Sequence, residues 1–115
     1  MDSQLFELAT LFQNECRYVV SVEHLPTKVR FGLRGGFVFD LFYRAKTGNY
    51  SYVLIKNDGR VIGWNNAPHY DELETHPHHF HAEDGSVSAS EIGAHPHSDI
   101  VLVARRVNEF LATRV

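Results

Sequence analysis

The sequence predicts an α+β fold in which two helices cover one face of an antiparallel β-sheet. Apolar residues recur at helical spacing near both ends of the chain. Between residues 18 and 65 they instead alternate with polar residues at every second position. The chain has 115 residues, 43% of them hydrophobic and 22% charged, which is typical of one globular domain. Two helices on one face would bury the apolar stripes of both.

The N-terminal helix is expected to begin at Asp2 or Ser3, because either side chain can accept hydrogen bonds from free backbone amides. Its apolar face follows at helical spacing: Leu5, Leu8, Ala9, Phe12 and Cys16. Cys16 is the single cysteine, which excludes an internal disulfide and a four-cysteine zinc site and fits a reducing cytoplasm. We expect no signal peptide and no membrane span.

An antiparallel meander of four or five strands is expected to follow the first helix. In the first strand, Tyr18, Val20 and Val22 alternate with polar or outward positions. The pair Gly35-Gly36 and the stretch "NDGR" at residues 57–60 mark two hairpin turns between alternating runs. One face of this meander is apolar and the other carries much of the positive charge.

Residues 66–97 are predicted to be an irregular, histidine-rich loop containing three of the four prolines. Order resumes at Ser98, which can cap a C-terminal helix that has Asp99 in its first turn. The apolar stripe of that helix consists of Ile100, Val103, Ala104, Val107, Phe110 and Leu111.

Charge is divided unevenly along the chain. Residues 26–65 carry a net charge of +5, whereas residues 66–99 contain seven acids, no Lys or Arg, and seven of the eight histidines. The overall charge of -3 disfavours broad nonspecific binding of nucleic acid, but a local basic face does not.

The histidines allow acid–base chemistry, because imidazole titrates near neutral pH and two imidazoles can serve as base and acid. RNA cleavage by this route needs no metal if a cationic side chain stabilises the negative charge of the phosphorane intermediate. Candidates for proton transfer are His69, His78, His79 and His81. Candidates for binding phosphate are Arg30, Arg44 and Arg60, and candidates for stacking on a base are Tyr50, Tyr52 and Trp64.

Two other interpretations stay open. His79 and His81 are two residues apart, so an extended strand would project them together, and with His69 they could bind zinc or another transition metal. Alternatively, the loop is a solvated connector that neutralises the basic face, and Trp64 simply packs in the core. In that case the chain is a non-catalytic module that binds a partner through a sheet edge or helix stripe.

The stretch "GRVIGWNNAPHYDELETHPHHFHAEDG" resembles the hallmark of the TumE toxin family, small prokaryotic proteins of toxin–antitoxin pairs. The family pattern is a strand ending in W-D-N-A-P-H-H, an acid, then F-P-H-H-K-H and a glycine-containing turn. The matching residues are Trp64, Asn66, Ala67, Pro68, His69, Glu72, Glu74, Pro77, His78, His79 and His81. The chain departs from the pattern at Asn65, His76 and Phe80, which replace Asp, Phe and Lys.

The resemblance implies a single toxin domain over residues 1–115, a helix-turn-helix antitoxin as partner, and a ribonuclease or other block on translation. We expect a cytoplasmic, metal-independent ribonuclease in which Asn66 and Glu74 orient the histidines, and a homodimer is a further candidate assembly. The loss of the lysine at position 80 is expected to remove a phosphate-binding cation from the centre of the motif.

Overall fold

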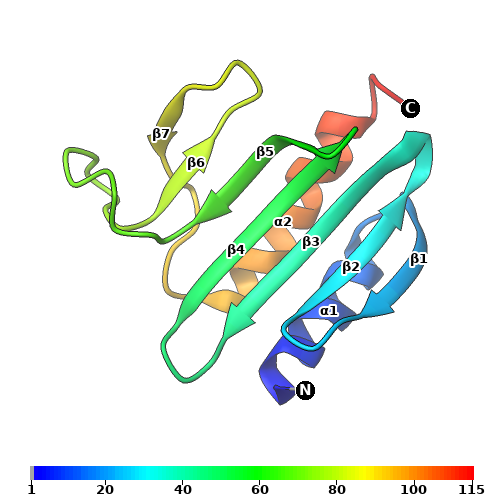
Figure 1. Cartoon of the computed structure of the whole chain (residues 1–115), viewed down its shortest axis with the longest axis horizontal. Coiled ribbons are helices and arrows are strands. Elements are labelled where there is room, and N and C mark those ends of the chain that lie inside the picture. The colour runs from blue at the N-terminus through cyan, green and yellow to red at the C-terminus, as the bar shows by residue number, and fades with distance from the viewer. Residues whose placement is uncertain (1) are drawn as a thin grey trace.

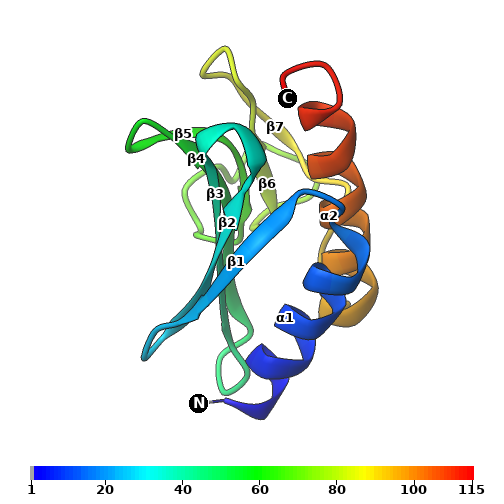
Figure 2. The ribbon, with the colours of Figure 1, turned by 90° about the vertical axis from the view of Figure 1, so that its right-hand side faces the viewer.

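The computed structural model describes residues 2–115. The elements are α1 (Ser3–Glu15), β1 (Val19–His24), β2 (Lys28–Leu33), a 3-10 turn (Arg34–Gly36), β3 (Phe37–Arg44), β4 (Asn49–Lys56), β5 (Gly59–Asn65), β6 (His79–His81), β7 (Val87–Ala89) and α2 (Pro96–Leu111). The strands form one sheet in the order β1-β2-β3-β4-β5-β6-β7, with antiparallel neighbours throughout. Both helices cover the same face of this sheet, which confirms the predicted α+β class (Figures 1 and 2).

The sheet has seven strands in the described residues, not the four or five expected. The two additional strands, β6 and β7, lie in the segment that was predicted to be entirely loop. Each has only three residues, which is too short for an alternating pattern to be recognised in sequence. The pairing of β6 with β5, and of β7 with β6, extends the sheet and determines which way the side chains of His79 and His81 point.

Aromatic and aliphatic side chains fill the space between the sheet and the helices. Phe12 of α1 stacks on Phe39 of β3, with 4.1 Å between ring centroids, and contacts Phe31 of β2 at 4.8 Å. On α2, Ile100 and Leu111 of the predicted stripe are fully buried. The predicted cap of α1 is also confirmed, since the Asp2 carboxylate accepts hydrogen bonds from the Gln4 and Leu5 amides.

The predicted hairpin turns are present and have the backbone geometry that their residues favour. Gly35 and Gly36 have φ of 80° and 79°, which suits a residue without a side chain. Asn57 and Asp58 have φ of 53° and 63°, as expected for the left-handed turn that matches the twist of a hairpin.

The predicted alternation of side chains in the first strand was wrong. The pairing of β1 with β2 shifts between Val19 and Ser21, so Val19 and Val22 pack on the core whereas Val20 is 63% exposed. A β-bulge of this kind breaks the period of two that the sequence suggested.

The C-terminal helix begins at Pro96, two residues before the expected cap at Ser98. Proline fits the first helical position because the amide it lacks would have no partner there. The buried Asp99 carboxylate accepts hydrogen bonds from the backbone amides of Gly93 and His95, both at 3.1 Å, and so fixes the entry into α2. Among residues 2–115, neither helix is long and apolar enough to cross a membrane.

Candidate functional site

The alternation of side chains along β6 places His79 and His81 on one face of the sheet and Phe80 on the other. His79 pairs with Asn65 and His81 with Gly63, while Phe80 between them pairs with Trp64. The Phe80 ring packs on Trp64 with 5.0 Å between centroids, and both line a groove with Arg106 and Phe110 of α2. Because side chains alternate along a strand, His79 and His81 project from the opposite face, which no helix covers.

The two imidazoles form a compact group with Tyr70. Their ring centroids are 4.9 Å apart, and the Tyr70 ring lies 4.7 Å from His79 and 6.1 Å from His81. Tyr70 belongs to the segment between β5 and β6, which folds back over the open face. As a result His79 is only 1% exposed and His81 is 9% exposed.

A backbone carbonyl determines the tautomer of His79. Its Nδ1 lies 3.1 Å from the Pro77 carbonyl oxygen, which can only accept, so Nδ1 carries the hydrogen. The lone pair of the neutral ring is therefore on Nε2. Nε2 has no hydrogen-bond partner within residues 2–115, and in that part of the chain no fully buried side-chain N or O atom lacks one. Nε2 must therefore reach the solvent of the cleft.

Arg60 brings a positive charge next to His81. A Cβ added at Gly63, the partner of His81 across β5 and β6, would lie 3.2 Å from Arg60 Cδ. The absence of a side chain at Gly63 thus lets Arg60 lie across the sheet. Burial lowers the pKa of His81 below its ordinary value of 6.5, and the charge of Arg60 lowers it further, so His81 is neutral at pH 7.

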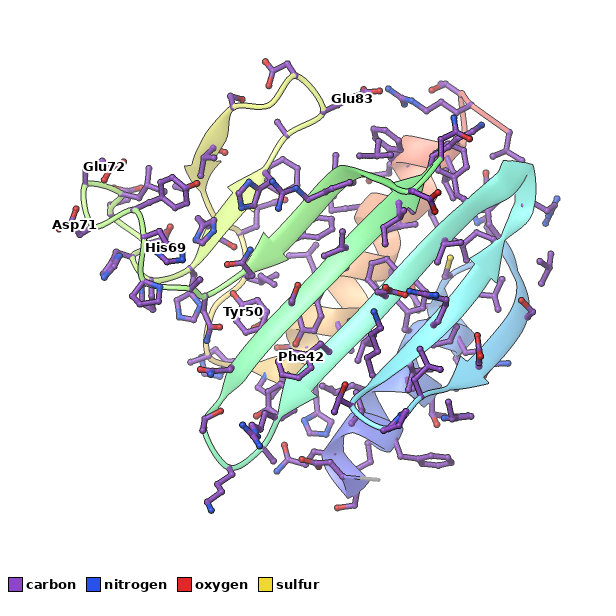
Figure 3. The ribbon with its side chains drawn as sticks, viewed as in Figure 1. Phe42, Tyr50, His69, Asp71, Glu72 and Glu83 are labelled. Atoms are coloured by element: carbon purple, nitrogen blue, oxygen red, sulfur yellow. The ribbon has the colours of Figure 1, made fainter. Side chains whose placement is uncertain are left out.

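These groups line a cleft of about 580 Å³ on the open face. Of the residues selected from sequence, the cleft contains His69, His79, His81, Arg60 and Asn66. Tyr50, one of the residues proposed from the sequence to stack on a base, also lines it. The cleft further contains residues that were not selected as site residues: Asn49, Ser51, Asn65, Ala67, Pro68 and Tyr70. Figure 3 shows Tyr50 on the sheet and His69 on the loop beside it, whereas the acidic Asp71 and Glu72 lie at the loop's outer tip, away from the basic strands.

His78, which was predicted to be catalytic, lies elsewhere. Its ring stacks on Tyr50 at an interplanar angle of 14°, and its Nδ1 is 2.9 Å from the Tyr50 hydroxyl. It lines a small separate pocket with Tyr52 and Pro96. Burial lowers the pKa of His78, more than the nearby Asp99 carboxylate raises it. These contacts give His78 a packing role between β4 and the start of α2.

Three residues predicted to bind substrate are also outside the cleft. Trp64 is 2% exposed and faces the helices, so its ring is not available for stacking on a base. Arg30 makes two hydrogen bonds of 2.8 and 2.9 Å to the Asp40 carboxylate, which Lys28 also contacts at 2.9 Å. Part of the predicted basic face is therefore neutralised within the sheet. Arg44 is exposed at the end of β3, where it lines a different pocket.

Within residues 2–115, the two residues predicted to orient the histidines make no side-chain hydrogen bond to a histidine. The Asn66 side chain accepts a hydrogen bond from the Tyr50 amide and donates one to the Gly48 carbonyl, both at 3.0 Å. It therefore fastens the loop after β5 to the β3–β4 turn. Glu74 is exposed and does not line the cleft.

The replacement of lysine at position 80 does not affect the cleft, contrary to the sequence prediction. Phe80 faces α2, so a cation at this position would project from the face opposite His79 and His81.

Sequence signals for the overlooked residues were present but ambiguous. Tyr70 directly follows His69 in the motif, and Gly63 interrupts an otherwise apolar strand, where glycine marks a close approach.

The alternative metal ligands are only partly assembled. His69, His79 and His81 line the same cleft. Nevertheless, no group of three or more His, Cys, Asp or Glu side chains within residues 2–115 is arranged to hold a metal ion.

The fold and the cleft define a small α+β protein that carries two imidazoles and a guanidinium on an open sheet face. A family model described as "Toxin TumE" matches residues 8–114. The chain therefore belongs to the TumE toxin family, whose members are toxins of toxin–antitoxin systems with an antitoxin as partner. No curated protein and no solved structure matches the sequence.

Proposed function

We propose that this toxin is a metal-independent ribonuclease that cleaves RNA by acid–base catalysis with His79 and His81. The observation that carries the proposal is the position of both imidazoles beside Arg60 in one cleft. Two imidazoles and a cation are the groups that transesterification of RNA requires.

His81 is the member of the pair suited to act as base, because its lowered pKa keeps it neutral at pH 7. It would remove the proton from a ribose 2′-hydroxyl as the 2′ oxygen forms a bond to phosphorus. The bond from phosphorus to the 5′ oxygen then breaks, and protonated His79 donates the Nε2 hydrogen to that oxygen. The products are a 2′,3′-cyclic phosphate and a free 5′-hydroxyl.

Arg60 would stabilise the negative charge that develops on the phosphoryl oxygens. A guanidinium suits this role because it remains charged and can donate two parallel hydrogen bonds to phosphate. His69, exposed at the rim of the same cleft, is available to contact the RNA backbone.

Tyr70 would control access to the pair. Its ring contacts both imidazoles, and His79 exposes only 1% of its surface. Solvent reaches His79 Nε2, but a phosphate is larger than water and would need the Tyr70 ring to move aside. Loop movements of this kind also exclude water from a reacting site once the substrate is bound.

The proposal includes a helix-turn-helix antitoxin as the partner and the cytoplasm as the place of action, with a homodimer as one candidate assembly. Co-expression with a helix-turn-helix protein encoded next to this chain, followed by purification and light scattering of any complex, would test the partner and the assembly.

The decisive experiment uses purified, untagged protein and a single-stranded RNA, with the 2′-deoxy oligonucleotide of the same sequence as a control. We expect cleavage of the RNA alone, a cyclic phosphate on the product, and an unchanged rate in the presence of EDTA. Intact RNA under these conditions would overturn the proposal.

Two arginine variants test the role of the cation. Arg60→Ala should lower the cleavage rate by about 10²-fold, since it removes a group that stabilises charge in the transition state. Arg44→Ala is the matched control, because Arg44 is exposed but lies outside the cleft, and it should leave the rate unchanged. An equal effect of the two substitutions would contradict the assignment of Arg60.

A further inference from the structure

A row of polar side chains crosses the open face at the level of His79. Ser51 of β4 pairs with Asn65 of β5, and Asn65 pairs with His79 of β6. All three line the cleft. Neighbouring strands are about 4.8 Å apart, so the row extends roughly 10 Å from the imidazole to the serine hydroxyl.

The orientation of the Asn65 amide is fixed. Its Oδ1 accepts a hydrogen bond of 3.0 Å from the Ala67 backbone amide. Only the oxygen can accept from an N–H group, so Nδ2 must point the other way. Asn65 therefore presents a hydrogen-bond donor to the cleft, while its acceptor is engaged with the backbone.

Both polar groups of the row are available to a ligand. Within residues 2–115, Asn65 Nδ2 and Ser51 Oγ have no hydrogen-bond partner. In the same part of the chain no fully buried side-chain N or O atom lacks a partner, and both residues are half-buried. The two atoms must therefore be accessible from the cleft.

We propose that Asn65 and Ser51 form a subsite that selects the nucleobase beside the scissile phosphate, an inference that rests on the proposed ribonuclease function. The length of the row suits one nucleotide, with its ribose at His79 and the edge of its base toward Ser51. Unpaired bases of single-stranded RNA are recognised in this way, through hydrogen bonds to their edges.

The donor at Asn65 specifies a class of base. Uracil and guanine carry a carbonyl oxygen next to a ring N–H, so the oxygen accepts from Asn65 Nδ2 while the N–H donates to Ser51 Oγ. Adenine is usually bound by an asparagine that both donates and accepts, but here the Asn65 oxygen is already bonded to Ala67. The Ser51 hydroxyl can both donate and accept, so the choice of base depends on Asn65. With Asn65 Nδ2 placed on the exocyclic group, uracil O4 and guanine O6 can accept its hydrogen bond and the amino groups of cytosine and adenine cannot, so the subsite favours uracil and guanine over cytosine and adenine.

The test measures binding independently of cleavage. The probes are fluorescent 2′-fluoro oligonucleotides with one central base flanked by abasic residues, which cannot be cleaved because the 2′-hydroxyl is missing. For the wild type we expect uracil or guanine to bind at least about fivefold more tightly than cytosine or adenine, the lower range for one base-specific contact.

Asn65→Ala should abolish the preference for uracil and guanine. Asn65→Asp should reverse the order of uracil and cytosine, because the carboxylate accepts from the cytosine amino group and repels the uracil carbonyl oxygen. Comparing affinity ratios within each variant removes the general repulsion between the new charge and the phosphates. Circular dichroism melting curves of the variants establish that they are folded.

Equal affinities for the four bases, no binding, or an unchanged preference in Asn65→Asp would each overturn the subsite. Parallel assays on unmodified RNA separate this inference from the proposed function. A base preference without cleavage supports the subsite and overturns the ribonuclease, whereas cleavage without preference does the reverse.

Discussion

The two faces of the sheet around β6 use adjacent residues for different purposes. On the open face, His79 and His81 present imidazoles to a polar cleft next to Arg60. On the other face, Phe80 and Trp64 pack toward α2. His78, immediately before the strand, belongs to this second group because it stacks on Tyr50 beside the start of α2.

The comparison shows that a cluster of histidines in sequence is not one cluster in space. The alternation of side chains along an extended backbone divides the run 78–81 into a candidate chemical pair and a packing pair. It also explains why the identity of residue 80 affects contacts with α2 and not the charge of the cleft. Four sets of variants test whether the two faces differ in this way.

The largest effect is expected for the imidazole pair itself. His79→Ala and His81→Ala should each lower the rate of RNA cleavage by about 10²–10⁴-fold, the usual contribution of a general acid or base. His78→Gln is the matched control and should leave the rate unchanged, because His78 is outside the cleft. The first-order rate of cleavage of one RNA would be measured for each variant. If His78→Gln lowers this rate as much as His79→Ala or His81→Ala, then the catalytic role is not confined to the open face.

Trp64 tests the packing face. Trp64→Ala should lower the free energy of unfolding by about 3–5 kcal/mol, since a large side chain that is 2% exposed leaves a cavity when removed. Trp64→Phe fills more of the space and should cost less, which denaturant titration would measure. If Trp64→Phe instead weakens RNA binding at unchanged stability, then Trp64 is a stacking residue as the sequence suggested.

Asn66 tests whether a residue of the motif can be purely structural. Asn66→Ala leaves the Tyr50 amide and the Gly48 carbonyl without their partner, so unfolding should require about 1–3 kcal/mol less. Asn66→Asp keeps the acceptor for the Tyr50 amide but loses the donor to the Gly48 carbonyl. Its free energy of unfolding should therefore lie between those of the wild type and Asn66→Ala. A variant of unchanged stability but lower cleavage rate would show that Asn66 acts on the histidines instead.

The smallest effect is expected from pH. The pKa values of His78 and His81 in the folded protein lie below their ordinary value of 6.5, so the unfolded chain binds protons first as the pH falls. Stability should therefore be complete above about pH 6.5 and decrease below it. Denaturant titrations at pH 7.5 and pH 5 should show this decrease, and the His78→Gln/His81→Gln double variant should show less of it. If the double variant loses as much free energy of unfolding between pH 7.5 and pH 5 as the wild type, then other groups cause the pH dependence.

Much of the fold was predictable because its signals are local. Helical spacing identified the buried residues of both helices, and the residue types of Gly35-Gly36 and of the stretch 57–60 identified turns whose positive φ angles the structure confirms. The site was less accessible to prediction. His79, His81 and Arg60 were among the candidates named from the sequence, but only the structure places them in one cleft, and Tyr70, Ser51 and Asn65 were not selected. Polar residues of this kind are common in loops and on exposed strands, so their type alone carries little information.

The fold class, the family motif and the projection of His79 and His81 to one side of an extended segment could all be read from the sequence. These follow from the period of side chains along one backbone, which needs no knowledge of neighbours. The tertiary structure decided which face of the sheet that side is, that Arg60 lies across Gly63 beside His81, and that Trp64 and His78 pack on the other face. These outcomes depend on strand pairing and on the position of α2, which bring together residues far apart in the chain.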